Sequence, residues 1–274
     1  MEADWCKFTN LKLGNNYYTG NGVEVDFVKA LFYYEAAAMQ GVDAAQFNSA
    51  IMYHNGEGTE QNMEKAIRYY EMAAQNNHEA ALINLGAIYF EGTGVEKDYK
   101  LAFKYYVALA QTVGCDEGFY KVGRMYREGL GVKLNLKEGL RFTKVAADKG
   151  HSDALVDLGF CYEKGLGTDI DLEKAIDYYR LSEKKGNICA AFNLGSVYEN
   201  GTGVEKDLEQ ALNYFKQSAD GGFESAQHYL GVWFEEGKGG EINLEQAVKY
   251  YKLAAEQGNS KAEESLNRLQ SSVV

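Results

Sequence analysis

Small and apolar residues recur along the chain with a period of about 36 residues. One small residue marks each copy at the same place, and the six intervals between these markers are 36 or 37 residues long. Self-similarity at such a period is typical of repeat architectures, so each copy is expected to form one structural unit. The seven markers are Gly14, Ala50, Gly86, Gly123, Gly159, Gly195 and Gly231.

Each copy contains two apolar patterns with the spacing of an α-helix. In the sixth copy, Ala190, Leu194 and Tyr198 recur at every fourth residue and predict a first helix, which we call helix A. Ala211 and Phe215 have the same spacing in the second half of the copy and predict helix B. No segment alternates between apolar and polar residues as a half-buried strand does. The pattern therefore predicts tandem helical hairpins.

Two glycines separate the helices of each copy, as Gly201 and Gly203 do in the sixth. The first is expected to end helix A in a left-handed conformation, and the second to turn the chain. Asp207, or an Asp or Asn at the same place in other copies, is expected to cap helix B by accepting hydrogen bonds from its free N–H groups. Gln210 follows three residues later, which predicts a capping box.

One helical hairpin cannot bury its apolar face alone, but stacked hairpins bury a continuous core. We therefore expect an all-α solenoid of seven 36-residue helix-turn-helix repeats, forming a single domain over residues 1–274. A C-terminal capping helix is expected within 258–274, begun by a capping box of Ser260 and Glu263. The repeats are predicted at about 5–40, 41–76, 77–113, 114–149, 150–185, 186–221 and 222–257.

The fourth copy departs from the others. Thr143 stands where other copies have an aromatic residue, Gly139 replaces an alanine, and one residue is inserted near Val113 and Gly114. These changes predict a slight bend in the stack.

The shared motif is AxxxLGxxYxxGxGVxxDxxKAxxYYxxAAxxG, clearest in 81–106 and 190–214. It resembles the Sel-one-like repeat, a branch of the tetratricopeptide superfamily, over essentially the whole chain. The resemblance implies a right-handed α–α superhelix with helix A on the concave side, and work as an adaptor or scaffold in signalling, protein quality control or host interaction. Unlike many members, this chain has no proline after GxGV and no disulfide within each repeat.

The same resemblance places four positions per repeat on the concave face: −3, +1, +4 and +5 from the marker. Apolar residues occupy many of them, where a solvated face would be polar, and charges follow one rim. They predict a groove for an extended segment or a helix of another protein, the alternative being that they pack against the next helix A. The candidates are Phe47, Ile51, Ile83, Phe90, Tyr120, Arg124, Arg127, Val156, Phe160, Phe192, His228 and Val232.

The net charge of −12, from 28 basic and 40 acidic residues, argues against nucleic acid and against anionic membranes as partners. It favours a neutral or basic protein, although it is also compatible with a role in solubility alone. No apolar run approaches the ~20 residues of a membrane span. An acidic residue stands two positions after the second glycine of the pair in six copies, either as an attractant for a basic partner or as a solvated loop edge: Glu24, Glu60, Glu96, Asp169, Glu205 and Glu241.

Candidate chemistry is sparse. The GxG motifs have no preceding strand and no following GK[ST], as phosphate-binding loops require. The four histidines and four cysteines lack the spacing of a zinc site. The sequence therefore predicts no enzyme, no cofactor and no metal. Cysteines without a disulfide framework suit the cytoplasm, with a secretory or periplasmic location as the alternative if a signal peptide has been removed.

We expect a protein-interaction scaffold that binds a peptide or protein partner. The alternative is a regulatory or substrate-recruiting module of a larger enzyme assembly, such as a ubiquitin ligase or a kinase. The open ends of the solenoid, in particular the N-terminal one, could support a homodimer.

Overall fold

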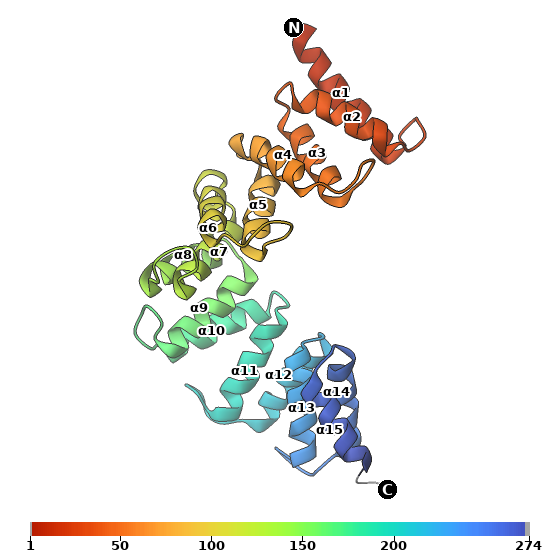
Figure 1. The fold of residues 1–274 in the computed structure, drawn as a ribbon. Coiled ribbons are helices and arrows are strands. Elements are labelled where there is room, and N and C mark those ends of the chain that lie inside the picture. The colour runs from red at the N-terminus through yellow and green to blue at the C-terminus, as the bar shows by residue number, and fades with distance from the viewer. Residues whose placement is uncertain (1, 272–274) are drawn as a thin grey trace. The chain divides into compact units, whose positions relative to one another are not determined.

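The computed structural model describes the backbone of residues 2–271 and the side chains of residues 8–269 and 271. Within these residues the chain is helical throughout and contains no strand, which confirms the predicted all-α class (Figure 1). The chain divides into two compact units, Met1–Ala146 and Ala147–Val274, and each is described by itself. A single domain over 1–274 stays a prediction.

The helices alternate between the predicted A and B types, so odd-numbered helices up to α13 are helices A and even-numbered ones are helices B. The first unit contains α1 (Glu2–Thr19), α2 (Phe27–Ala38), α3 (Asp43–Asn55), α4 (Met63–Gln75), α5 (Glu79–Glu91), α6 (Tyr99–Ala108), α7 (Asp116–Glu128) and most of α8 (Leu136–Asp148). The second contains α9 (Ser152–Lys164), α10 (Leu172–Glu183), α11 (Ile188–Asn200), α12 (Leu208–Asp220), α13 (Glu224–Glu236), α14 (Leu244–Glu256) and the capping helix α15 (Ser260–Ser271).

All seven helices B begin at the predicted Asp or Asn cap, whose side chain accepts from an N–H three residues later. The predicted capping box is wrong. The N–H of Asp207 donates to the Tyr198 carbonyl at 2.9 Å, so it is already occupied. Gln210 Nε2 donates instead to the Asp207 carboxylate at 2.9 Å. In α15 the cap is Asn259, which accepts from the N–H of Ala262 at 2.8 Å, rather than Ser260.

The paired glycines have separate roles. Gly56 ends α3 in the left-handed region, at φ 75°, as predicted. Gly58 also has a positive φ, of 70°, and a Cβ there would lie 2.5 Å from the carbonyl carbon of Phe27. The second glycine therefore lets the loop of one repeat lie against the start of helix B in the preceding repeat.

Gly58→Ala is expected to lower the free energy of unfolding by about 3 kcal/mol. The alanine would have to adopt a left-handed backbone conformation, and its Cβ would also clash with the backbone of Phe27. The matched control is Gly41→Ala. Gly41 has φ 82°, and a Cβ there meets no atom within 4 Å. The control should cost only about 1 kcal/mol, the penalty for the backbone conformation alone. Urea unfolding measures both, and equal losses would show that the close approach at Gly58 contributes nothing.

The marker residue sets how closely helices A and B of one repeat approach. A Cβ on Gly195 would lie 2.6 Å from Phe215 Cδ1, so the bare glycine makes room for the ring. Beside this contact, tyrosine pairs stack within repeats, as Tyr162 and Tyr178 do at 5.7 Å between ring centroids. The core of each unit consists of such rings with alanine and leucine between them.

Hydrogen bonds between helices B link adjacent repeats inside each unit. In the first unit, Tyr69 Oη donates to Glu35 Oε1 at 3.0 Å. In the second, Gln217 Nε2 donates to Glu183 Oε1 at 2.6 Å. Donor and acceptor are 34 residues apart in both cases, so these bonds repeat with nearly the period of the sequence.

The irregular fourth repeat has a local explanation. The inserted residue is absorbed by a π-helical turn, Leu109–Val113, which ends at Gly114. Arg127 takes the place that the missing aromatic ring would fill: its Nη1 donates to Thr143 Oγ1 at 3.0 Å. A Cβ on Gly139 would collide with Arg127 Cγ. The arginine, the threonine and the glycine thus form one compensating set. The predicted bend stays a prediction.

Candidate partner-binding surface

All twelve candidate residues lie on helices A, as predicted: seven on α3, α5 and α7 of the first unit, and five on α9, α11 and α13 of the second. Eleven are half-buried, and Phe160 is the exception, with 44% of its surface exposed. The candidate residues therefore differ in how far a partner can reach them.

In the first unit the aromatic candidates pack on their neighbours. Phe47 stacks on His78 at 4.7 Å between ring centroids. Phe90 meets Tyr99 edge-on at 5.3 Å, and the Arg124 guanidinium lies 6.0 Å from its centroid. Ile51, Ile83 and Tyr120 are half-buried on the same helices. Each of these side chains keeps part of its surface exposed to solvent.

The two candidate arginines of α7 have different surroundings. Arg124 forms an exposed ion pair with Glu128, with Nε 2.7 Å from Oε1. Arg127 bonds to Thr143 inside its own repeat and serves the packing described above.

In the second unit, Phe192 sits within an aromatic cluster. Its centroid lies 5.3 Å from that of Phe215 and 5.8 Å from that of Tyr229. Val156 and Val232 are half-buried against neighbouring core clusters, and the imidazole of His228 lies 5.8 Å from the Tyr251 ring. Packing against both helices A and helices B accounts for much of the surface of these candidates.

Phe160 borders an open hollow between α9 and α11. The hollow has a volume of about 200 Å³. Asn193 and Asn200 on α11 contribute carboxamides to its lining, and the largely buried Val197 lies at its edge. Lys164 lies beside the ring, with Nζ 6.0 Å from the Phe160 centroid. The hollow therefore combines an exposed ring with groups that can both donate and accept hydrogen bonds.

A row of glutamates at the +4 position runs along helices A of the second unit. Glu163 accepts from Tyr179 Oη at 2.9 Å, and its equivalents Glu199 and Glu235 also accept from tyrosine hydroxyls. Each glutamate also has a cation nearby, namely Lys164, Lys238 or Arg268. The Arg268 guanidinium lowers the pKa of Glu235. These carboxylates are balanced by cations and add little net charge to the surface.

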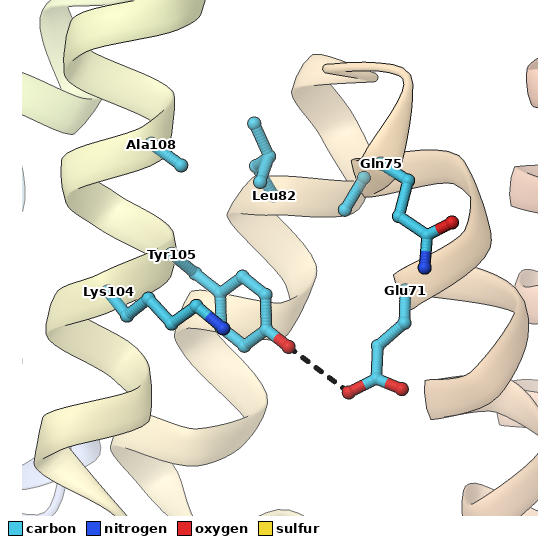
Figure 2. Close-up of a pocket in the computed structure, with 7 residues that line it drawn as sticks. Glu71, Gln75, Leu82, Lys104, Tyr105 and Ala108 are labelled. Atoms are coloured by element: carbon cyan, nitrogen blue, oxygen red, sulfur yellow. Dashed lines mark hydrogen bonds between the residues drawn. The ribbon is translucent and has the colours of Figure 1, made fainter.

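A second hollow, of about 380 Å³, lies in the first unit and is lined by α4, α5 and α6 (Figure 2). Glu71 and Gln75 of α4 face Lys104 and Tyr105 of α6 across it, with Leu82 of α5 in the lining. Tyr105 Oη donates to Glu71 Oε1 at 3.1 Å. Burial, followed by the nearby Glu71 carboxylate, raises the pKa of Tyr105.

The sequence predicted only part of the hollow beside Phe160. Lys164 and Asn200 stand at the predicted position five residues after a marker glycine. Asn193 stands two residues before its marker, which is not one of the four predicted positions. The hollow at Glu71 is lined mainly by helices B, where no partner surface was predicted. Its signal is the inter-repeat pair of Glu71 and Tyr105, which only the packing of the repeats brings together.

Three cysteines, Cys115, Cys161 and Cys189, are free thiols, whereas the side chain of Cys6 lies outside the described residues. Burial raises the pKa of the Cys115 and Cys189 thiols. Across the part of the chain that the structure describes, no helix combines the length and the apolar character needed to cross a membrane.

Comparison with known proteins defines the class. The Sel1 repeat model matches seven segments of the chain, residues 10–42, 43–78, 79–111, 120–151, 152–187, 190–223 and 224–259. These segments follow the helical hairpins, so the protein is a solenoid of helix pairs. The chain belongs to the Sel1 repeat family, as its sequence motif indicated. None of the curated proteins matches the chain in sequence.

Solved structures agree with this assignment. A protective antigen of uropathogenic Escherichia coli strains, described as displaying an SLR fold, is 31% identical over 96% of this chain, with a TM-score of 0.78. This chain spans 56% of that protein's length. A Sel1 repeat protein from Oxalobacter formigenes is 26% identical, with a TM-score of 0.83, and the match covers 97% of this chain and 77% of the other. Sel1 repeat proteins are generally protein-interaction scaffolds.

Proposed function

We propose that the chain is a scaffold that holds a segment of another protein on the helix A surface, with the hollow beside Phe160 as the main contact. The observation that carries this proposal is the exposure of Phe160 next to a hollow lined by carboxamides. Exposed aromatic rings are frequent anchors in protein interfaces. Within the same unit, the candidates on α11 and α13 extend this surface, and those on α3, α5 and α7 offer a surface of the same kind in the first unit.

The chemistry of the hollow suits an extended peptide. An apolar side chain of the partner can pack on Phe160, while Asn193 and Asn200 can pair with its peptide groups. A carboxamide offers both a donor and an acceptor, as a backbone amide does. The contact requires no catalytic group, in keeping with a scaffold rather than an enzyme.

A basic partner is favoured by charge. The six acidic residues that follow the paired glycines are all exposed, and the chain carries a net charge of −12. Exposed charges act mainly on the rate of association and are screened by salt.

We place the protein in the cytoplasm, supported by its free thiols.

The test uses peptides selected on the wild-type chain from a random phage-displayed library. Phe160→Ala and Asn193→Ala are each expected to weaken the binding of these peptides at least tenfold, because they remove an anchor and a hydrogen-bonding group. Leu181→Ala, at an exposed apolar residue on helix B, is the matched control and should leave the affinity unchanged. Isothermal titration calorimetry measures all three. Peptides that bind the Phe160→Ala chain as tightly as the wild type would refute the proposed site.

A further inference from the structure

Helix α2 carries three exposed apolar side chains on one face. Val28, Phe32 and Met39 are 66%, 65% and 75% exposed. They are spaced by four and seven residues, and Met39 keeps the helical backbone conformation at the end of α2. This spacing places them on the same side of the helix. We call this set the α2 stripe.

The same three positions are polar and exposed in all six other repeats. The equivalents of Val28 are Glu64, Lys100, Lys137, Glu173, Glu209 and Glu245. Those of Phe32 are Arg68, Lys104, Arg141, Asp177, Asn213 and Lys249, and those of Met39 are Gln75, Gln111, Asp148, Lys184, Asp220 and Glu256. The stacking of repeats therefore does not bury these positions, and the fold does not need apolar residues there.

The charges on α2 are already balanced. The helix has two charged residues, Lys29 and Glu35. Lys29 Nζ lies 3.0 Å from Asp26 Oδ2, and Glu35 accepts hydrogen bonds from the hydroxyls of Tyr53 and Tyr69. A basic partner would be drawn to the exposed acidic loops rather than to this face. Two copies of a chain with net charge −12 repel elsewhere, so a neutral face is where they can approach.

The exposed area is large enough to form the centre of an interface. Phe8, 67% exposed, lies at the same end of the α1–α2 hairpin as Met39, because Leu11 one turn later packs against Ala37 and Ala38. The three side chains of the stripe expose on the order of 400 Å² of apolar surface, more than single scattered residues do, and Phe8 adds apolar surface at the same end of the hairpin. A stable dimer buries about 800 Å² per partner, with an apolar centre and a polar rim.

We propose that two copies of this chain associate through the α2 stripe. The contact is isologous, so the same apolar face serves both copies and no unpaired charge is buried. It lies on helix B of the first repeat and leaves the helix A surface free, so self-association and partner binding are separate properties of the chain.

The test replaces the stripe with the residues of α4. The triple variant Val28→Glu, Phe32→Arg, Met39→Gln gives the first repeat the side chains that the second carries at the same exposed positions, and its fold should be kept. Sedimentation equilibrium over a range of concentrations is expected to show a dimer for the wild type. The variant is expected to dimerise at least tenfold more weakly, because it places charges in an apolar contact.

Leu181→Gln is the matched control. Leu181 is 46% exposed on α10, and Gln217 stands at its equivalent position in the next repeat. This variant should dimerise like the wild type. If the triple variant loses its circular dichroism spectrum, Phe32→Arg alone takes its place. A wild type that stays monomeric at all concentrations overturns the proposal and leaves the stripe to another occupant, and an unweakened dimer in a folded variant overturns it as well.

Discussion

Trp233→Ala is expected to lower the free energy of unfolding of the second unit by about 4 kcal/mol, the usual cost of deleting a fully packed aromatic side chain. The Trp233 side chain is 2% exposed, and its ring lies 5.6 Å from that of Phe215 and 6.3 Å from that of Tyr229. The substitution removes both ring contacts and leaves a cavity beside Phe215 and Tyr229. Urea unfolding measures the loss.

The effect should also stay local. In a repeat protein each repeat contacts mainly its neighbours, so a substitution destabilises its own repeat and the adjacent repeats most. Hydrogen exchange of the Trp233→Ala chain should be faster in α11–α15 and unchanged in α1–α6. The control is Phe160→Ala, which removes an exposed ring and should cost less than about 1 kcal/mol. Equal exchange changes along the whole chain would mean that the protein does not unfold as a stack of repeats.

Thr143→Tyr is expected to cost about 3 kcal/mol, because it forces a ring into a fully packed site. Thr143 is completely buried, and Arg127 already occupies the adjoining space. The triple variant Arg127→Glu, Gly139→Ala, Thr143→Tyr should recover to within about 1 kcal/mol of the wild type, since it reproduces the set Glu163, Ala175 and Tyr179 of the fifth repeat. Such coupling is a signature of residues that act together.

Thermal and urea unfolding of the single and triple variants check this prediction. If the triple variant is as unstable as the sum of its single substitutions, the three residues do not form a compensating set. The irregularity of the fourth repeat would then need another cause.

The sequence was sufficient for the repeat, its helices and most of its turns. Periodic residues such as Gly195 and Asp207 make their contacts within one hairpin. The spacing of residues along the sequence is therefore enough to predict their roles in helix packing and helix capping. The capping box failed because the N–H of Asp207 bonds to Tyr198, a residue of the preceding helix. The hydrogen bond between Asp207 and Tyr198 uses the N–H group that a capping box needs, and the local sequence motif does not report this bond.

The burial of each candidate side chain could not be predicted from the sequence. Periodicity placed Phe160 and Phe192 on the same kind of helix, but it does not say how much neighbouring repeats cover them. Phe192 packs against Tyr229 of the next helix A, whereas Phe160 remains open beside Asn193. Burial depends on the residues of adjacent repeats, which differ from copy to copy.

The α2 stripe, in contrast, was within reach of the sequence. Val28, Phe32 and Met39 stand in columns that are polar in every other repeat. The sequence shows this contrast between repeats, and the structure adds that the same positions are exposed in every repeat.

The central claim, that a guest segment binds on helix A beside Phe160, is tested most directly by site-specific photocrosslinking. Benzoylphenylalanine is placed at position 160 on α9 and, in a second chain, at position 181 on α10. Each is irradiated with a peptide selected on the wild type. We predict that the peptide is crosslinked from position 160 and not from position 181. Crosslinking from position 181 alone would contradict the account.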